Sequence, residues 1–124
     1  MFDCSESSAY LEWALEDAGF DAYIVVGACP WDPSRGSHAW VLVRTDEGEW
    51  VAIEATHGWI VYKDYTSEYS RWCSEECYQR YYSYDEMYSN IYQAVERYYP
   101  YYGYSEWDWW RGYGTYVRLF RYVH

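Results

Sequence analysis

The chain has few basic residues. Its 124 residues include only nine Lys and Arg against 20 Asp and Glu, which gives a formal net charge of −11. A protein that binds nucleic acid or an anionic membrane surface needs clustered basic side chains to neutralise phosphate groups, and the Arg residues form no such cluster in the sequence. The composition therefore argues against nucleic acid and anionic membranes as partners.

Long apolar segments are also missing. No run approaches the roughly 20 apolar residues that a transmembrane helix needs, and no charged-then-apolar leader precedes Phe2. We therefore expect no membrane span, while the missing leader leaves the compartment open.

Cysteine is too scarce for a disulfide scaffold, and a chain of this length can fold without covalent cross-links. The four cysteines are Cys4, Cys29, Cys73 and Cys77. One option is a disulfide from Cys29 to Cys73 or Cys77, which leaves Cys4 as a free thiol. Another is a zinc site built from Cys29, Cys73, Cys77 and His57, although these lack the paired short spacings of zinc modules. We expect no metal and no other cofactor.

Met and Phe are rare, with two and three residues, whereas Tyr occurs 19 times and Trp nine times. Seventeen of the 19 Tyr lie at or beyond Tyr62. Most of these rings are expected in the core or on a half-buried surface, because aromatic side chains bury large areas while a polar tip stays in water. Others can line a groove for sugar or peptide, or form a surface for self-association.

The first half of the chain has clear local patterns. The segment after Cys4 has apolar residues at helical spacing and a Gly where the helix would stop, and the next segments are β-branched or alternate in polarity. A helix that ends before Gly19 is followed by predicted strands at 21–28, 37–45, 50–56 and 59–63, with a tight turn at 46–49.

The second half is harder to read. We predict a helix at 67–82 and a second helix that starts from a capping box of Ser83 and Glu86 and ends before Pro100. An aromatic loop from 101 and a closing strand at 115–123 complete the chain. The expected fold class is α+β in one domain, with a core at 1–63 and a Tyr/Trp-rich helical extension at 64–124.

Three polar residues form the candidate site. Cys4 opens a helix, whose N-terminus favours a thiolate, and His38 and Glu54 lie on the two strands of the predicted hairpin. Position 38 would lie opposite 56 or 57, so the two side chains would be cross-strand or diagonal neighbours. A thiol, an imidazole and a carboxylate in this order suit a nucleophile, a base and an orienting group. The alternatives are an inert Cys4, His57 as the base, and a solvent-facing Glu54.

A family resemblance rests on the same residues. The segments FDCSESSAYLEWALEDAGFDAYIVVGA, GSHAWVLV and GEWVAIEAT resemble the core of the transglutaminase-like cysteine enzymes. That family has a Cys that opens a helix, a Gly-x-His-Ala-Trp strand, and an Asp shortly after the hairpin. The resemblance covers roughly residues 2–57 and implies a papain-like fold with a Cys4, His38 and Glu54 triad. Glu54 stands where the family usually has Asp.

The resemblance also bears on the oxyanion site and on substrate contacts. Family members usually have a helix before the Cys, whereas three residues precede Cys4 here. The backbone N–H of Cys4 is one expected oxyanion donor, and an indole N–H that folds back from the C-terminal segment is a second candidate. The expected substrate-binding residues are Trp40, Trp107, Trp109 and Trp110.

The resulting functional prediction is cysteine-dependent acyl transfer on an amide or isopeptide bond of a protein, a peptide or a cell-surface polymer. The thioester intermediate passes to water or to an amine, and hydrolysis is favoured. The SEWDWW run after a Tyr-rich helix resembles archaeal surface-associated members of the family and favours an extracellular or cell-surface location. The rival predictions are a non-catalytic, aromatic-rich binding or assembly domain on the same fold, and a structural zinc module.

Overall fold

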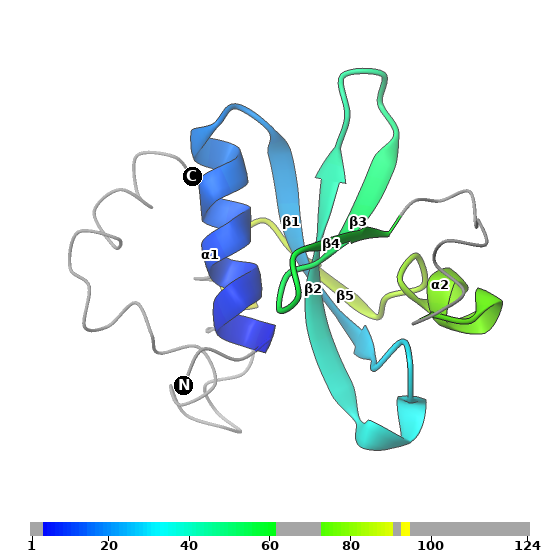
Figure 1. Ribbon diagram of the computed structural model, residues 1–124. Coiled ribbons are helices and arrows are strands. Elements are labelled where there is room, and N and C mark those ends of the chain that lie inside the picture. The colour runs from blue at the N-terminus through cyan, green and yellow to red at the C-terminus, as the bar shows by residue number, and fades with distance from the viewer. Residues whose placement is uncertain (1–3, 62–72, 91–92, 95–124) are drawn as a thin grey trace.

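The computed structural model of the protein describes residues 4–61, 73–90 and 93–94. This part of the chain forms one antiparallel five-stranded sheet with a helix on each side (Figure 1). The fold class is therefore α+β, as the sequence predicts. The elements are α1 (Cys4–Asp17), β1 (Asp21–Ala28), the 3-10 turn η1 (Pro33–Arg35), β2 (Ser37–Arg44), β3 (Trp50–Glu54), β4 (Trp59–Val61), α2 (Glu75–Arg80) and β5 (Glu86–Tyr88).

The strands lie in the order β4-β3-β2-β1-β5, so β2 is the central strand. All four neighbouring pairs are antiparallel. The six residues from His38 to Val43 are buried. Successive side chains of a strand point to opposite faces, so a strand that is buried along its whole length must be covered on both faces.

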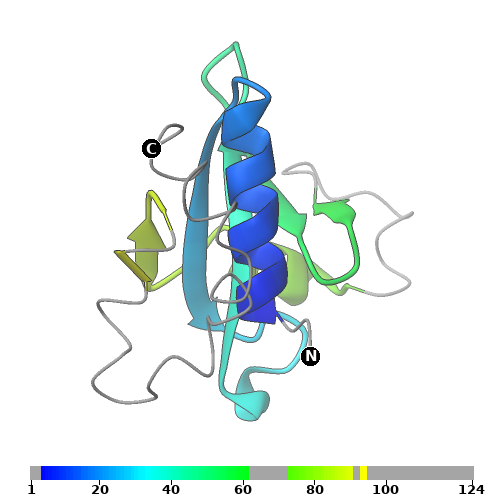
Figure 2. The same ribbon diagram turned by 90° about the vertical axis from the view of Figure 1, so that its left-hand side faces the viewer.

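The longer helix, α1, covers one face of the sheet. Leu11 and Leu15 pack against Ala22 of β1 and against Val41 and Val43 of β2. Figure 2 shows the helix lying in front of the sheet along the direction of these strands. The helix ends at Asp17, and the chain then reverses through Gly19, whose φ of 95° is a left-handed conformation that favours Gly. This packing fixes the position of the first helical residue, Cys4, relative to β2.

The opposite face is covered by the segment around α2. Its core consists of strand residues and of residues from this segment, namely Val25, Trp40, Leu42, Ala52, Val61, Cys73, Cys77, Tyr78 and Tyr81. Two of the abundant Tyr, Tyr78 and Tyr81, are therefore core residues, while most of the other Tyr lie outside the described residues. Trp40 is fully buried and is the largest side chain of this cluster.

The first-half predictions agree with the structure. The helix, the strand at 21–28 and the turn at 46–49 are confirmed, the predicted strand 37–45 ends at Arg44, and the predicted strand 50–56 ends at Glu54. The predicted strand 59–63 is present at 59–61, and its last two residues lie outside the described part. The helix predicted at 67–82 is only partly present: α2 begins at Glu75, after the N-cap Ser74, and ends at Arg80, while residues 67–72 lie outside the described part.

The capping-box prediction is wrong. Glu86 begins β5, which pairs with β1 through Val26↔Glu86, Val25↔Met87 and Ile24↔Tyr88. One edge of β1 pairs with β2, and the backbone groups on its other edge are free to pair with a further strand. The hydrogen bonds that residues 86–88 form with this edge outweigh the local tendency of Ser83 and Glu86 to start a helix. Gln93 and Ala94 are helical, with the backbone N–H of Gln93 bonded to Asn90 Oδ1 at 3.0 Å. The predicted loop from 101 and the strand at 115–123 lie outside the described residues.

No helix in the described ranges is long and apolar enough to cross a membrane.

Gly27 allows a close approach between β1, Trp40 and the chain before β5. A Cβ atom at this position would lie 3.2 Å from Trp40 Cη2 and 3.2 Å from the Cα atom of Tyr84. We expect Gly27→Ala to lower the free energy of unfolding by about 1–3 kcal/mol, because the Tyr84 backbone cannot move aside as a flexible side chain would. Urea denaturation measures this change. Ser37→Ala, at an exposed strand position, is the control, with an expected change below about 0.5 kcal/mol.

Candidate active site

Cys4 occupies the first position of α1, where its side chain is half-buried and its thiol is free. The backbone N–H groups of a first helical turn have no partner inside the helix, so this end of α1 carries partial positive charge. Such an environment favours negative charge on a nearby sulfur.

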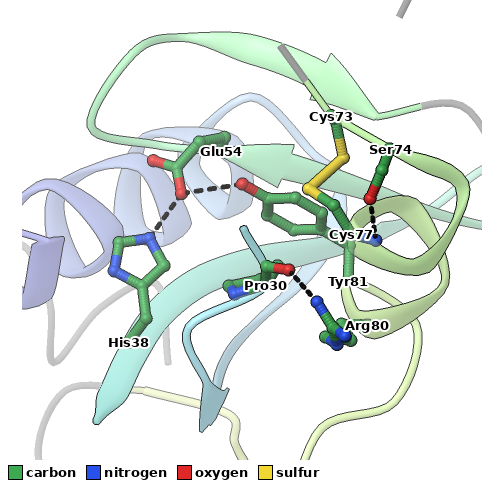
Figure 3. Close-up of a disulfide and its surroundings, with 8 residues drawn as sticks. All are labelled: Pro30, His38, Glu54, Cys73, Ser74, Cys77, Arg80 and Tyr81. Carbon is green, nitrogen blue, oxygen red and sulfur yellow. Dashed lines mark hydrogen bonds and ion pairs between the residues drawn. A yellow bond between two sulfur atoms is a disulfide. The ribbon is translucent and has the colours of Figure 1, made fainter. Parts of the chain in front are cut away.

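His38 lies near the start of β2, and Glu54 is the last residue of β3. The paired residues Val41↔Ile53 and Leu42↔Ala52 set a register that, when continued, puts position 38 opposite position 56. His38 and Glu54 are therefore diagonal neighbours, as the sequence predicts. The Nε2–H group of His38 donates a hydrogen bond to Glu54 Oε1 (Figure 3).

His38 also forms a hydrogen bond with Cys4, so one ring joins the thiol to the carboxylate. Burial of the ring lowers its pKa, but the hydrogen bonds to Cys4 and Glu54 and the negative charge of these two residues outweigh burial and raise the pKa of His38 to about 9. Because Nε2 is engaged by Glu54, Nδ1 is the nitrogen left for the thiol. The structure therefore brings together all three residues that the sequence proposes for the site.

Glu54 is fully buried, which excludes the alternative of a solvent-facing strand carboxylate. Besides His38, two further groups bind its carboxylate. The backbone N–H of Thr56 donates to Oε2 at 2.9 Å, and the hydroxyl of Tyr81 donates to Oε1 at 3.3 Å. Each of these bonds satisfies an oxygen that burial has removed from water.

Tyr81 and Thr56 were not identified from the sequence. Tyr81 is one of 19 Tyr and lies in no motif, and Thr56 contributes only its backbone. Contacts of this kind depend on where the α2 segment packs, so no local signal would have found them.

The tryptophans near the site have different environments. Trp40, an expected substrate-binding residue, is fully buried, and its indole N–H donates to the Tyr81 carbonyl at 3.0 Å. Its ring stacks at 6.1 Å from the His38 ring, so Trp40 supports the imidazole from the core. Half-buried Trp31 contacts His38 edge-on, with 4.7 Å between ring centroids. The predicted contacts from Trp107, Trp109 and Trp110 lie outside the described residues, and so does their candidate oxyanion donor.

His57, the competing base, is exposed and stacks on Trp59, with 4.6 Å between ring centroids. Its ring also lies 6.4 Å from the ring of Trp31, measured between centroids. The geometry therefore favours His38 over His57 as the partner of Cys4.

The disulfide differs from the expected pairing. Cys73 and Cys77 are bonded to each other, and Cys29 is a buried free thiol. The four-residue spacing places both sulfurs on one face of the chain around α2, within bonding reach, whereas Cys29 lies in the loop after β1. Cys73 and Cys77, which belong to the suggested set of zinc ligands, are thus bonded to each other and are not available to bind a metal ion. Within the described ranges, no three His, Cys, Asp or Glu residues form a group suited to a metal ion.

Comparisons with known proteins give little further information. No family model and no solved structure matches the chain. An uncharacterized protein of Methanocaldococcus jannaschii is 46% identical over 56 residues. The aligned region covers 45% of this chain and 24% of that protein, so the chain matches about a quarter of its relative's length.

Proposed function

We propose that Cys4, His38 and Glu54 are the catalytic residues of a cysteine-dependent acyl-transfer enzyme with a papain-like, transglutaminase-like core. The observation that carries this proposal is the His38 ring, which bonds Cys4 and Glu54 at the same time. A helix N-terminus at the sulfur and a buried carboxylate at the far nitrogen support the same assignment, since these are the surroundings that activate a thiol.

The proposed reaction begins with transfer of the Cys4 thiol proton to Nδ1 of His38. The raised pKa of His38, about 9, makes the ring a strong acceptor for this proton, and the proposed mechanism therefore pairs a Cys4 thiolate with an imidazolium before substrate binds. Glu54 accepts the Nε2–H bond throughout, and thereby fixes the ring orientation.

The thiolate then attacks the carbonyl carbon of an amide or isopeptide bond. The C–N bond of the substrate breaks, and the imidazolium gives its proton to the departing amine. The acyl group remains on Cys4 as a thioester. Water or a second amine attacks the thioester and restores the thiol. We favour water as the acceptor, because the acidic surface has no evident feature that recruits a lysine substrate beyond its charge.

The disulfide bears on location. Disulfides persist in oxidising compartments and are rare in the reducing cytosol of mesophiles. In a mesophile, the Cys73–Cys77 bond would therefore support an extracellular or cell-surface location for the proposed enzyme, whereas intracellular proteins of hyperthermophilic archaea also carry disulfides.

Iodoacetamide labelling tests the proposed function without knowledge of the substrate. At pH 6 we expect Cys4 to be alkylated at least about tenfold faster than glutathione, because an ordinary thiol is almost entirely protonated at this pH. Mass spectrometry of the Cys4 peptide measures the rate, and buried Cys29 provides a slow internal comparison.

Two His variants make this test specific. His38→Ala should reduce the Cys4 rate to that of glutathione, whereas His57→Ala, at the exposed histidine, should leave the rate unchanged. A wild-type rate no faster than glutathione would contradict the enzyme proposal and leave the non-catalytic binding domain as the better interpretation.

A further inference from the structure

The Glu54 carboxylate needs restraint beyond its bond to His38. Glu has one more rotatable bond than Asp, so a Glu that orients an imidazole loses more side-chain freedom when it is held in place. In this protein Oε1 accepts from both His38 and Tyr81, while Oε2 accepts from the Thr56 backbone. The Tyr81 bond is the one contributed by the chain on the α2 side of the sheet (Figure 3).

The Tyr81 hydroxyl acts as a hydrogen-bond donor. Tyr81 is fully buried, and burial, the negative charge of Glu54, the hydrogen bond to Glu54 and nearby Cys29 raise the pKa of Tyr81 above its usual range. The phenol therefore keeps its proton at any physiological pH, and a protonated phenol donates to a carboxylate.

The position of Tyr81 depends on α2, which ends one residue before it. Trp40 Nε1–H donates to the Tyr81 carbonyl, and the two rings meet edge to face with 5.4 Å between centroids. Arg80 Nη1 donates to the carbonyl of Pro30 at 2.9 Å. These contacts fix the C-terminal end of the helix against the sheet and against the loop after β1.

A disulfide closes the N-terminal end of α2 on itself. Ser74 is the N-cap of the helix, and the disulfide joins Cys73, which precedes it, to Cys77 in the first turn. The backbone N–H of Cys77 also donates to Ser74 Oγ at 3.1 Å. A helix of six residues is too short to be stable alone. Both sulfurs lie in the same buried cluster as Trp40 and Tyr81.

We propose that Tyr81 is a positioning residue for Glu54, and that the Cys73–Cys77 disulfide regulates the Cys4 site by holding α2, and hence Tyr81, in place. This proposal rests on the proposed function. A dithiol reductant breaks the S–S bond by supplying two electrons and two protons, which yields two thiols and the oxidised, cyclic disulfide of the reductant. Loss of this bond loosens α2 and weakens the Tyr81 contact, so full Cys4 reactivity develops only in an oxidising compartment.

The test compares Cys4 alkylation rates at pH 6 in the wild type and in three variants. We expect Tyr81→Phe, which keeps the ring against Trp40, to lower the rate about three- to tenfold, the effect of one lost hydrogen bond. We expect Cys73→Ser/Cys77→Ser to lower the rate by a similar factor. Combining the changes should lower the rate little further, because both act through one contact. Reduction of the wild type with dithiothreitol gives the same comparison without mutation.

Tyr82→Phe is the matched control. Its hydroxyl bonds the Val61 carbonyl and the Ala52 N–H, away from Glu54, so this change should leave the Cys4 rate and its response to dithiothreitol unaltered. Circular dichroism of each variant reports folding. The pH profile of the Cys4 rate is the second readout, and it should shift in Tyr81→Phe but not in Tyr82→Phe.

The outcomes separate this proposal from the proposed function. A fast wild-type rate that is unchanged in folded Tyr81→Phe and after reduction would overturn the positioning role and leave the triad intact. Fully additive effects of Tyr81→Phe and the double Ser variant would overturn the link through α2. A slow wild-type rate would remove the proposed enzyme itself.

Discussion

Replacing Glu54 with Gln should reduce a pH dependence of stability that the wild type shows between about pH 6.5 and pH 9. The folded-state pKa of His38 is about 9, above its ordinary value of 6.5. The protonated ring therefore stabilises the folded protein fully below pH 6.5, and this contribution is lost as the pH rises through 9. The shift corresponds to roughly 3 kcal/mol at 1.36 kcal/mol per pH unit.

Urea denaturation at several values between pH 6 and pH 9.5 measures the effect. In Glu54→Gln one of the two negative charges that favour imidazolium is gone, so the stability difference from the wild type should be largest at pH 6 and should shrink toward pH 9.5. Glu49→Gln makes the same chemical change at an exposed position of the hairpin turn and should retain the wild-type dependence.

Titration of the histidine ring by NMR gives the same answer directly. We expect the His38 pKa to fall by at least about one unit in Glu54→Gln. A wild-type His38 that titrates near 6.5, or an equal pH dependence of stability in wild type and Glu54→Gln, would contradict the charge arrangement described for the site.

Replacing Trp40 with Ala should produce the largest loss of stability at a neutral residue. Its ring is fully buried between the His38 ring and Tyr81, and removal of a buried Trp typically costs about 3–5 kcal/mol through lost burial and the cavity that remains. The Tyr81 carbonyl also loses its indole donor. We therefore expect a decrease of about 4 kcal/mol or more in the free energy of unfolding.

Two variants provide the comparison for Trp40→Ala. Trp40→Phe keeps most of the packing but not the N–H group, and should cost about 1–3 kcal/mol. Trp59→Ala removes a ring that is 42% exposed, so it should cost less than about 1 kcal/mol. Equal losses in Trp40→Ala and Trp59→Ala would show that Trp40 does not support the core beneath the site.

The sequence predicted secondary structure correctly where the signals lie between near neighbours in the chain. Apolar residues three and four apart with a following Gly indicated α1, and β-branched or alternating runs separated by turn residues indicated the strands from 21 to 61. The hairpin length also set the β2–β3 register, and with it the neighbour relation of His38 and Glu54.

The prediction of local structure or bonding failed where the same residues were compatible with more than one arrangement. Ser83 and Glu86 satisfy a capping box, yet Glu86 begins a strand because the free edge of β1 binds it. Cys73 and Cys77 suited a bond to Cys29, a metal site or a mutual disulfide. Only the packing around α2 distinguishes these options.

The sequence by itself therefore determined the α+β class, the helix and hairpin of the first half, and the order of thiol, imidazole and carboxylate along the chain. The tertiary structure decided the other features of the site. It buried Trp40 instead of exposing it, assigned β5 to the sheet, paired Cys73 with Cys77, and brought Tyr81 to Glu54 across 27 residues of sequence. The physical reason is that helix and turn signals act between near neighbours, whereas burial and hydrogen bonds to a buried carboxylate depend on which distant segments share a face of the sheet.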